Sequence, residues 1–348
     1  MEADGMGFRY PVIDKDLCVK CGLCEKVCAF HAVERETLPA AFAVRFPAYL
    51  GRSQSGGVGY ALLRKAIEEG MVVYGAAMDA GFVVRHRRVD SLDGLEPLRL
   101  SKYVQSDMDG IPGKVLKDLK EGRRVLFSGT PCQCAGLGTL CAQYRDRLYL
   151  VDIVCHSVPA PEVWKGFLRW QEAKKGAQLE KAVFRDPSLG WHTARTLLQF
   201  ANGESVHSDS FYFLFMKMLM SRPSCGTCPF ASTRRPSDLT MGDCQGVEKA
   251  LPGFADDNRG CSLVLLNTPR GQALFSLVEG DCENKSVDLQ QVLQPNLRTP
   301  SVPSPDALRF EKDFLRKGFP YVQARYGDEA LMNRIVAFYK KILRHLPL

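Results

Sequence analysis

Four cysteines near the start of the chain constrain its fold more than any other feature. Cys18, Cys21, Cys24 and Cys28 follow the pattern C-x2-C-x2-C-x3-C. This is the spacing with which bacterial ferredoxins bind a [4Fe–4S] cluster. Gly22 allows a tight backbone turn inside the run, and four soft thiolates suit iron–sulfur better than a hard cation. A zinc site normally uses two separated C-x2-C pairs, which makes zinc the less favoured interpretation of this run. Zinc or unligated thiols are the alternatives to iron–sulfur.

The fourth cysteine of this run has two possible roles. In two-cluster ferredoxins the fourth cysteine of each run binds the other cluster, yet the chain contains no second run of this kind. Ala29 also stands where the ferredoxin pattern has proline. Either Cys28 completes the cluster of its own run, or the partner run is missing. Only 17 residues precede Cys18.

The overall composition is that of a globular protein of two or three domains. The 348 residues are 45% hydrophobic and 24% charged. No stretch approaches 18 apolar residues, and the first seven residues lack a signal-peptide pattern, so we expect no membrane insertion. Thirteen cysteines in a long chain argue against a secreted disulfide framework and for a cytoplasmic location. The net charge of +7 favours an acidic partner weakly, and we expect no nucleic-acid binding.

Alternating strand and helix patterns predict an α/β fold. We expect strands at 71–78, 82–89, 124–129, 148–155, 180–186, 194–201, 238–243 and 261–267. We expect helices at 60–69, 113–121, 132–143, 161–175, 209–220 and 268–279. A strand at 7–14 and a helix at 31–36 would flank the cysteine run, and residues 39–58 are expected to be irregular. A Pro-rich linker at 299–308 precedes a helical tail that ends in an amphipathic helix near 329–346.

A second feature lies where an apolar strand meets a helix. The strand ends in Ser128, Gly129 and Thr130, and Pro131 suits the first helical turn. Backbone N–H groups and hydroxyls at such a junction form an anion site that would accept a cofactor phosphate. The alternative is that Thr130 only caps an ordinary helix. The presence of Cys132 at the same junction favours the anion site over a simple helix cap.

Cys132 has three potential partners elsewhere in the chain. Cys155 follows the next strand, and adjacent parallel strands would place these two cysteines side by side. Cys225 and Cys228 form a C-x2-C pair followed by proline. The four thiolates make a full cluster ligand set, while a zinc or redox half-site, or buried unreactive thiols, are the alternatives. His156 is a catalytic candidate, although a lone histidine is more often a structural hydrogen-bonding residue.

Six unusual motifs occur in an order that resembles one protein family. They are SGG (55–57), SKYVQS (101–106), LFSGTPCQ (126–133), VCHSVPAP (154–161), RPSCGTCPF (222–230) and SDLTMGD (237–243). The chain resembles the coenzyme F420 hydrogenase/dehydrogenase beta-subunit family, which is related to 7-hydroxymethyl chlorophyll a reductase. The resemblance covers roughly residues 7–280.

The resemblance implies an iron–sulfur protein that also contains FAD, whose flavin passes electrons between two-electron carriers and one-electron clusters. Carried over by motif, the residues that would line the flavin are Ser55, Gly56, Gly57, Ser101, Lys102, Tyr103, Ser128, Gly129 and Thr130. Lys102 would neutralise charge at flavin N1/O2 or on a phosphate. An inner cluster would be held by Cys132, Cys155, Cys225 and Cys228.

The chain departs from the family pattern in three ways. Bacterial proteins of this kind resemble a two-motif ferredoxin at their start, whereas this chain begins just before the second motif, so we expect an N-terminal truncation or a misplaced start. The other two departures are single segments. The segment that is usually similar to DFWG reads Asp243-Cys244-Gln245-Gly246 here. Loss of the aromatic pair could alter flavin packing, or Cys244 could compete as a cluster ligand. Ser157 replaces the glycine that usually follows the Cys-His pair.

These features together predict an α/β (α+β) protein in three parts. We expect a ferredoxin-type module lacking its first half, a mixed-sheet FAD/iron–sulfur domain and a helical C-terminal segment, at 1–38, 39–298 and 299–348. The expected function is an oxidoreductase that links ferredoxin or coenzyme F420 through [4Fe–4S] clusters to FAD and a small-molecule substrate. A dedicated reductase of a sugar or pigment precursor is a second enzyme hypothesis. Two hypotheses without catalysis are an electron-transfer subunit, docked on a partner redox subunit, and a zinc-structured scaffold.

Overall fold

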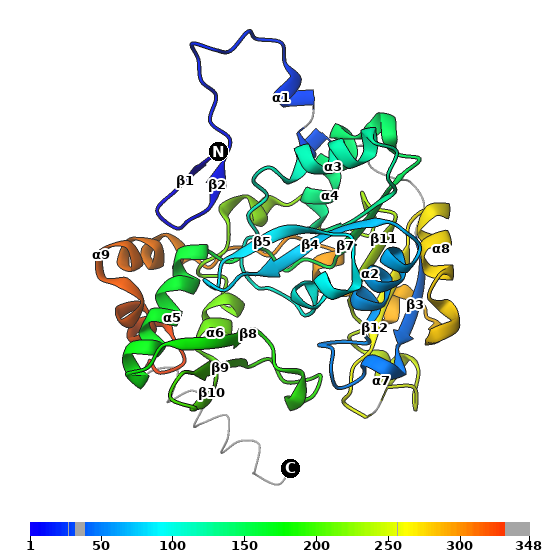
Figure 1. Cartoon of the computed structure of the whole chain (residues 1–348). Coiled ribbons are helices and arrows are strands. Elements are labelled where there is room, and N and C mark those ends of the chain that lie inside the picture. The colour runs from blue at the N-terminus through cyan, green and yellow to red at the C-terminus, as the bar shows by residue number, and fades with distance from the viewer. Residues whose placement is uncertain (27, 32–38, 256, 331–348) are drawn as a thin grey trace.

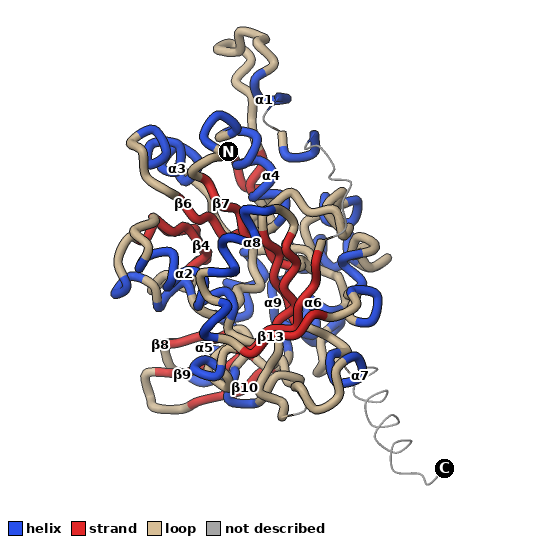
Figure 2. The backbone as a smooth tube through the Cα atoms, turned by 90° about the vertical axis from the view of Figure 1, so that its right-hand side faces the viewer, coloured by secondary structure: helices blue, strands red, loops and turns tan. Residues whose placement is uncertain are grey.

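A computed structural model describes residues 1–26, 28–31, 39–255 and 257–330 (Figure 1). Its core is an eight-stranded mixed sheet with the strand order β13-β3-β12-β11-β7-β6-β4-β5. These strands are β3 (Ala40–Arg45), β4 (Val72–Met78), β5 (Val84–Val89), β6 (Val125–Gly129), β7 (Leu148–Ile153), β11 (Leu239–Asp243), β12 (Ser262–Leu266) and β13 (Glu283–Ser286). A mixed sheet with helices around it confirms the predicted α/β class (Figure 2).

Two smaller sheets and the helices complete the fold. The smaller sheets are antiparallel and contain β8 (Leu179–Val183), β9 (Thr196–Phe200) and β10 (Ser205–Ser208), and β1 (Glu2–Ala3) and β2 (Arg9–Tyr10). The helices are α1 (Leu23–Lys26), α2 (Val58–Glu68), α3 (Ile111–Lys120), α4 (Pro131–Leu140), α5 (Pro161–Lys175), α6 (Ser210–Met216), α7 (Val247–Ala250), α8 (Pro269–Ser276) and α9 (Ala307–Tyr326). Within the described residues, no helix has the length and apolarity needed to cross a membrane.

The four central strands β4, β6, β7 and β11 run parallel to one another. Their register pairs Gly129 with Asp152 and Met241 with Ile153, so the carboxyl ends of β6, β7 and β11 lie level. The segments that follow these three strands therefore begin side by side at one edge of the sheet. In open α/β sheets this edge is where ligands usually bind.

The prediction that residues 39–58 are irregular was wrong for the first part of this range. Ala40–Arg45 form β3, an interior strand that pairs with β12 on one side and β13 on the other. Three of its six residues are alanines, which have low strand propensity. Strand β13 was also missed, because its sequence is polar and it lies at the edge of the sheet.

The strands and helices predicted between residues 60 and 279 are confirmed, with their ends shifted by a few residues. The predicted strand at 7–14 shrinks to Arg9–Tyr10. The C-terminal part forms α9, which contains a kink at Gly318 (φ 75°) two residues before Pro320. The helices predicted near 31–36 and 329–346 lie largely outside the described residues. The division of the chain at residues 38 and 298 stays a prediction.

A buried ion pair fastens the loop after α6 to the main sheet. Arg235 and Asp152 lie 3.1 Å apart, with side chains that are 1% and 0% exposed. The guanidinium of Arg235 also donates hydrogen bonds to the carbonyl oxygens of Phe230 (2.7 Å) and Ile153 (2.9 Å). These contacts hold the loop that carries Cys228 against the end of β7.

Replacing this arginine should destabilise the protein strongly. In Arg235→Ala the carboxylate of Asp152 stays buried without its counter-charge, so we expect the free energy of unfolding to fall by about 3–5 kcal/mol. Urea denaturation followed by circular dichroism measures this change. The control is Arg87→Ala on the exposed side of β5, which should change the free energy by less than about 0.5 kcal/mol. Equal effects of the two substitutions would contradict the role of the ion pair.

Candidate functional site

A cavity of about 1220 Å³ lies at the level carboxyl ends of β6, β7 and β11. Of the nine residues predicted to line a flavin, eight line this cavity: Ser55, Gly57, Ser101, Lys102, Tyr103, Ser128, Gly129 and Thr130. Gly56 is not among the lining residues. A Cβ atom at Gly56 would lie 2.1 Å from the carbonyl oxygen of Val44, so glycine is required there because the loop backbone packs directly on β3.

The four cysteines predicted to hold an inner cluster come together on one wall of this cavity. Cys132 lies in the first turn of α4, Cys155 follows β7, and Cys225 and Cys228 belong to the loop before β11. Burial raises the pKa of the Cys155 thiol, and the three other thiols raise it further. Burial likewise raises the pKa of Cys225 to about 11, with contributions from Cys132 and Cys228. The four sulfur atoms are therefore close enough to interact electrostatically.

The spacing of these thiols differs from that of a site for one metal ion. Among residues 1–26, 28–31, 39–255 and 257–330, no three histidine, cysteine or carboxylate side chains have single-ion spacing. A [4Fe–4S] cluster takes one thiolate at each of its four irons, so its ligands are spread around the cluster. The soft donor set of four cysteines suits such a cluster.

The remaining cysteines outside the N-terminal run do not line the cavity. Cys134, Cys141, Cys244 and Cys261 are buried, and Cys282 is half-buried. Cys244, considered above as a competing ligand, forms a side-chain hydrogen bond with Cys261, which raises its pKa. Both residues belong to an apolar cluster next to β12, and neither lines the cavity. Its neighbour in the chain, Asp243, does line the cavity.

His156 faces the cavity with a ring nitrogen that has no hydrogen-bond partner. Its Nδ1 lies 2.7 Å from Oδ1 of Asn296, and the amide group of Asn296 donates to Ser301 Oγ at 2.6 Å. An amide oxygen only accepts, so in the neutral ring Nδ1 carries the proton and Nε2 presents a lone pair. Nε2 is buried and makes no hydrogen bond within the described residues. A catalytic role for His156 stays a prediction.

His86 is a cavity residue that the motifs did not reveal. Its Nδ1 lies 2.7 Å from Ser106 Oγ, and its Nε2 lies 3.0 Å from the carbonyl oxygen of Ser128. Because that carbonyl accepts, Nε2 carries the proton and Nδ1 accepts from the serine hydroxyl. The ring also stacks on Phe127 at 5.1 Å. A single histidine within a strand gives no sequence signal, because only the fold brings the 101–106 segment against it.

Lys102 lies on the cavity wall without an ion-pair partner among the described residues, and Glu96 acts on it only from a longer distance. Its ammonium group donates to the carbonyl oxygen of Pro97 at 2.9 Å and also to that of Arg99. Within the described residues, no carboxylate lies at ion-pair distance from it. Burial lowers the pKa of Lys102 to about 7. An anionic group of a ligand would supply the missing counter-charge.

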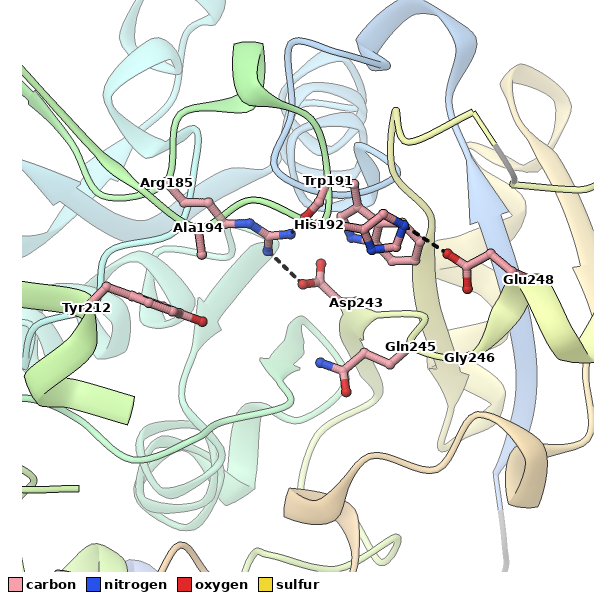
Figure 3. Close-up of a pocket in the computed structure, with 9 residues that line it drawn as sticks. All are labelled: Arg185, Trp191, His192, Ala194, Tyr212, Asp243, Gln245, Gly246 and Glu248. Atoms are coloured by element: carbon pink, nitrogen blue, oxygen red, sulfur yellow. Dashed lines mark hydrogen bonds and ion pairs between the residues drawn. The ribbon is translucent and has the colours of Figure 1, made fainter. Parts of the chain in front are cut away.

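A smaller chamber of about 280 Å³ adjoins the large cavity (Figure 3). Four residues line both spaces: Arg185, Tyr212, Asp243 and Gln245. The far wall of the chamber contains Trp191, His192 and Glu248. Arg185 Nη1 lies 2.7 Å from Asp243 Oδ2, and His192 Nε2 lies 3.2 Å from Glu248 Oε1. Asp243, Gln245 and Gly246 belong to the segment noted above as a departure from the family pattern, whereas the other lining residues come from distant segments without a motif.

The N-terminal cysteine run lies on a loop that projects from the body (Figures 1 and 2). Cys18, Cys21 and Cys24 are exposed, whereas Cys28 is half-buried. The turn after Cys28, Ala29–His31, packs on α4, and the ring of Phe30 lies 6.3 Å from that of Phe230. Phe230 is two residues from Cys228, so the end of the run approaches the inner cysteine wall.

Two segments of the chain match models of known protein families. Residues 122–290 match the family described as the C terminus of the beta subunit of coenzyme F420 hydrogenase/dehydrogenase. This part of the chain is therefore similar to the C-terminal domain of that family. Residues 10–33 match a 4Fe-4S binding domain, so the 4Fe–4S binding motif predicted from the cysteine run is confirmed. No curated protein matches the chain.

One solved structure with a similar fold is a chain of the xenon-derivatised F420-reducing [NiFe] hydrogenase complex from Methanosarcina barkeri. The TM-score is 0.51 and the sequences are 17% identical, over 84% of this chain and 95% of that chain. At this identity the likeness establishes the fold alone. The family domain contains all four cysteines of the inner wall and three of the predicted flavin residues, Ser128, Gly129 and Thr130.

The burial of His86 should make the stability of the protein fall in mild acid. Burial lowers the pKa of His86 from 6.5 to about 4, so the unfolded chain binds more protons between these two pH values. The stability contribution is complete above pH 6.5 and is lost as the pH falls toward 4, by roughly 3 kcal/mol. In His86→Gln the free energy of unfolding should lack this pH-dependent loss, because glutamine does not titrate. Urea denaturation from pH 7 to pH 4.5 measures it, and identical pH profiles of the two proteins would contradict the assignment.

Proposed function

We propose that this protein is an iron–sulfur flavoprotein oxidoreductase that passes electrons between [4Fe–4S] clusters and FAD, and thereby reduces or oxidises a small substrate. One observation carries the proposal. The four cysteines of the inner wall and eight of the nine flavin candidates line a single cavity. Ferredoxin or coenzyme F420 would serve as the external electron carrier.

The residues of the cavity are compatible with both cofactors. Four thiols on one wall match the ligand set of a [4Fe–4S] cluster. The volume of about 1220 Å³ exceeds that of a typical drug-sized pocket, as a dinucleotide requires. Lys102, which has no acidic partner among the described residues, is suited to an anionic phosphate or flavin group. The N-terminus of α4, which begins at Pro131 directly after the three flavin candidates Ser128 to Thr130, favours the same charge.

When bound, FAD supplies the exchange between two-electron and one-electron chemistry, and clusters supply one-electron transfer. The chain itself would contribute position and polarity. Ser128 and Gly129 end β6 at the cavity, and His86 fixes the carbonyl of Ser128 by a hydrogen bond. Lys102 would hold the anionic part of the cofactor. The four cysteines, of which Cys155, Cys225 and Cys228 are half-buried and Cys132 is exposed, would supply the thiolate ligands of the proposed cluster.

Two observations bear on whether the chain acts alone or as a subunit. Apolar side chains on the projecting loop are exposed, notably Leu17 (79%) and Val19 (82%), which favours contact with a partner redox protein. The small chamber beside the cavity instead favours a substrate of the chain's own. We therefore propose an enzyme with its own substrate, with the electron-transfer subunit as the second candidate. A cytoplasmic location remains part of this proposal and follows from the use of cysteines as ligands rather than disulfides.

Removing one inner ligand should lower the iron content selectively. Cys155→Ser should lose about four irons per chain and the corresponding visible absorption, because a hydroxyl is a much poorer ligand for iron–sulfur clusters than a thiolate. Iron and sulfide analysis after anaerobic purification measures the loss. The control is Cys282→Ser, outside the cavity, which should retain all iron. Unchanged iron in Cys155→Ser would refute the inner site.

Removing the unpaired cation should weaken flavin binding while leaving iron in place. Lys102→Met keeps a long side chain but lacks the charge, so we expect FAD to bind roughly tenfold or more weakly. Flavin fluorescence after ultrafiltration measures the dissociation constant. Lys114→Met on the exposed side of α3 is the matched control. FAD retained equally by both variants, or absent from the wild-type protein, would argue against the proposed flavin site.

A further inference from the structure

The small chamber next to the large cavity has a lining that selects for a particular chemistry. We propose that it binds a neutral, hydroxyl-rich molecule of about monosaccharide size, and that this molecule is the substrate. This identification of the substrate class rests on the proposed function, whereas the binding site itself does not. The charges of the chamber, its free hydrogen-bonding groups, its size and its position all favour this class of ligand.

The charges of the chamber disfavour an anionic ligand. Its one permanent cation, Arg185, is already engaged, because Nη1 lies 2.7 Å from the carboxylate of Asp243 and Nη2 donates to the carbonyl oxygen of Trp191. The second carboxylate, Glu248, is accompanied only by His192. No lining cation is therefore free to receive a phosphate or a carboxylate group, and the field of the two carboxylates would oppose one.

Several hydrogen-bonding groups of the chamber have no protein partner. The Tyr212 hydroxyl and the Gln245 amide make no side-chain hydrogen bond within the described residues, and Asp243 uses only Oδ2 for Arg185. In Figure 3 these three side chains point toward the same hollow. Together they offer a hydroxyl that donates or accepts, an amide that does both, and a free carboxylate oxygen. Such a mixed set matches a ligand with several hydroxyl groups.

The size and position of the chamber restrict the ligand further. At about 280 Å³ the chamber lies just below the range of drug-sized pockets, so it holds a small ring and not a tetrapyrrole or a deazaflavin cofactor with its tail. Tyr212 and the ring of Trp191 supply apolar faces beside the polar groups. Because four residues are shared with the large cavity, a molecule in the chamber lies next to the proposed flavin space.

Calorimetric titration of the holoprotein tests the proposal directly. The uncharged probes are the methyl pyranosides of glucose, galactose, mannose and xylose. The charged probes, both anionic, are glucose 6-phosphate and glucuronate. We expect at least one uncharged probe to bind with a stoichiometry of one, and each charged probe to bind at least tenfold more weakly.

Two substitutions connect this binding with the chamber. Tyr212→Phe and Gln245→Ala each remove one ligand partner and leave the Arg185–Asp243 ion pair in place, so each should weaken the bound probe about three- to tenfold. The control Gln290→Ala removes an exposed amide on the surface and should leave binding unchanged. Circular dichroism melting of the variants verifies that they remain folded.

The outcomes separate this proposal from the proposed function. No binding by any uncharged probe, tighter binding of a charged probe, or unchanged binding in both variants would overturn the chamber assignment. A wild-type protein without iron and flavin would overturn the proposed redox function. Probe binding that depends on Tyr212 and Gln245 in such a protein would still establish the chamber as a binding site.

Discussion

The parallel pairing of β6, β7 and β11 is the constraint on which the site depends. Because these strands end level, the segments that follow them must leave the sheet at the same place. Cys132 follows β6, Cys155 follows β7, and the Asp243 end of β11 leads into the chamber. Strand β3 is antiparallel to β12, which is antiparallel to β11, so β3 also ends at this edge. It delivers the 55–57 segment to the cavity, and pairing geometry thus assembles residues far apart in sequence.

Two ion pairs at this edge, one buried and one partly exposed, have different consequences. Arg235 is fully buried, forms an ion pair with Asp152 and donates hydrogen bonds to backbone carbonyls, so it fixes the path of the loop that carries Cys228. Arg185 lies on a cavity wall and neutralises Asp243, so it removes the positive charge that would otherwise attract anions. Lys102 differs from both because no described carboxylate lies at ion-pair distance. The same edge therefore combines a region around Lys102 that is suited to an anion with a region around Asp243 and Glu248 that disfavours anions.

The sequence revealed those parts of the fold and site that have a local pattern. Apolar strands such as β6 and helices such as α5 were predicted with small errors at their ends, because their periodicity and flanking residues are local signals. The cysteine positions could be grouped because parallel strands end together. The strand β3 was missed, since its alanines resemble neither a strand nor a helix clearly. The role of His86 and the enclosure of a chamber by Gln245 and residues from distant segments were also not predicted, because burial and three-dimensional neighbours define them.

The crowding of four thiols also links the site to the stability of the fold. Burial and mutual proximity raise the pKa of Cys155 and Cys225, so without metal these groups remain protonated thiols. Iron is bound by thiolates, so cluster binding would release protons from these thiols. The positive charge of the iron ions would also offset the repulsion between thiolates that the fold places close together. The loop with Cys225 and Cys228 is already held to β7 through Arg235. The fold therefore supplies the positions first, and a cluster would add the charge that makes four adjacent thiolates favourable.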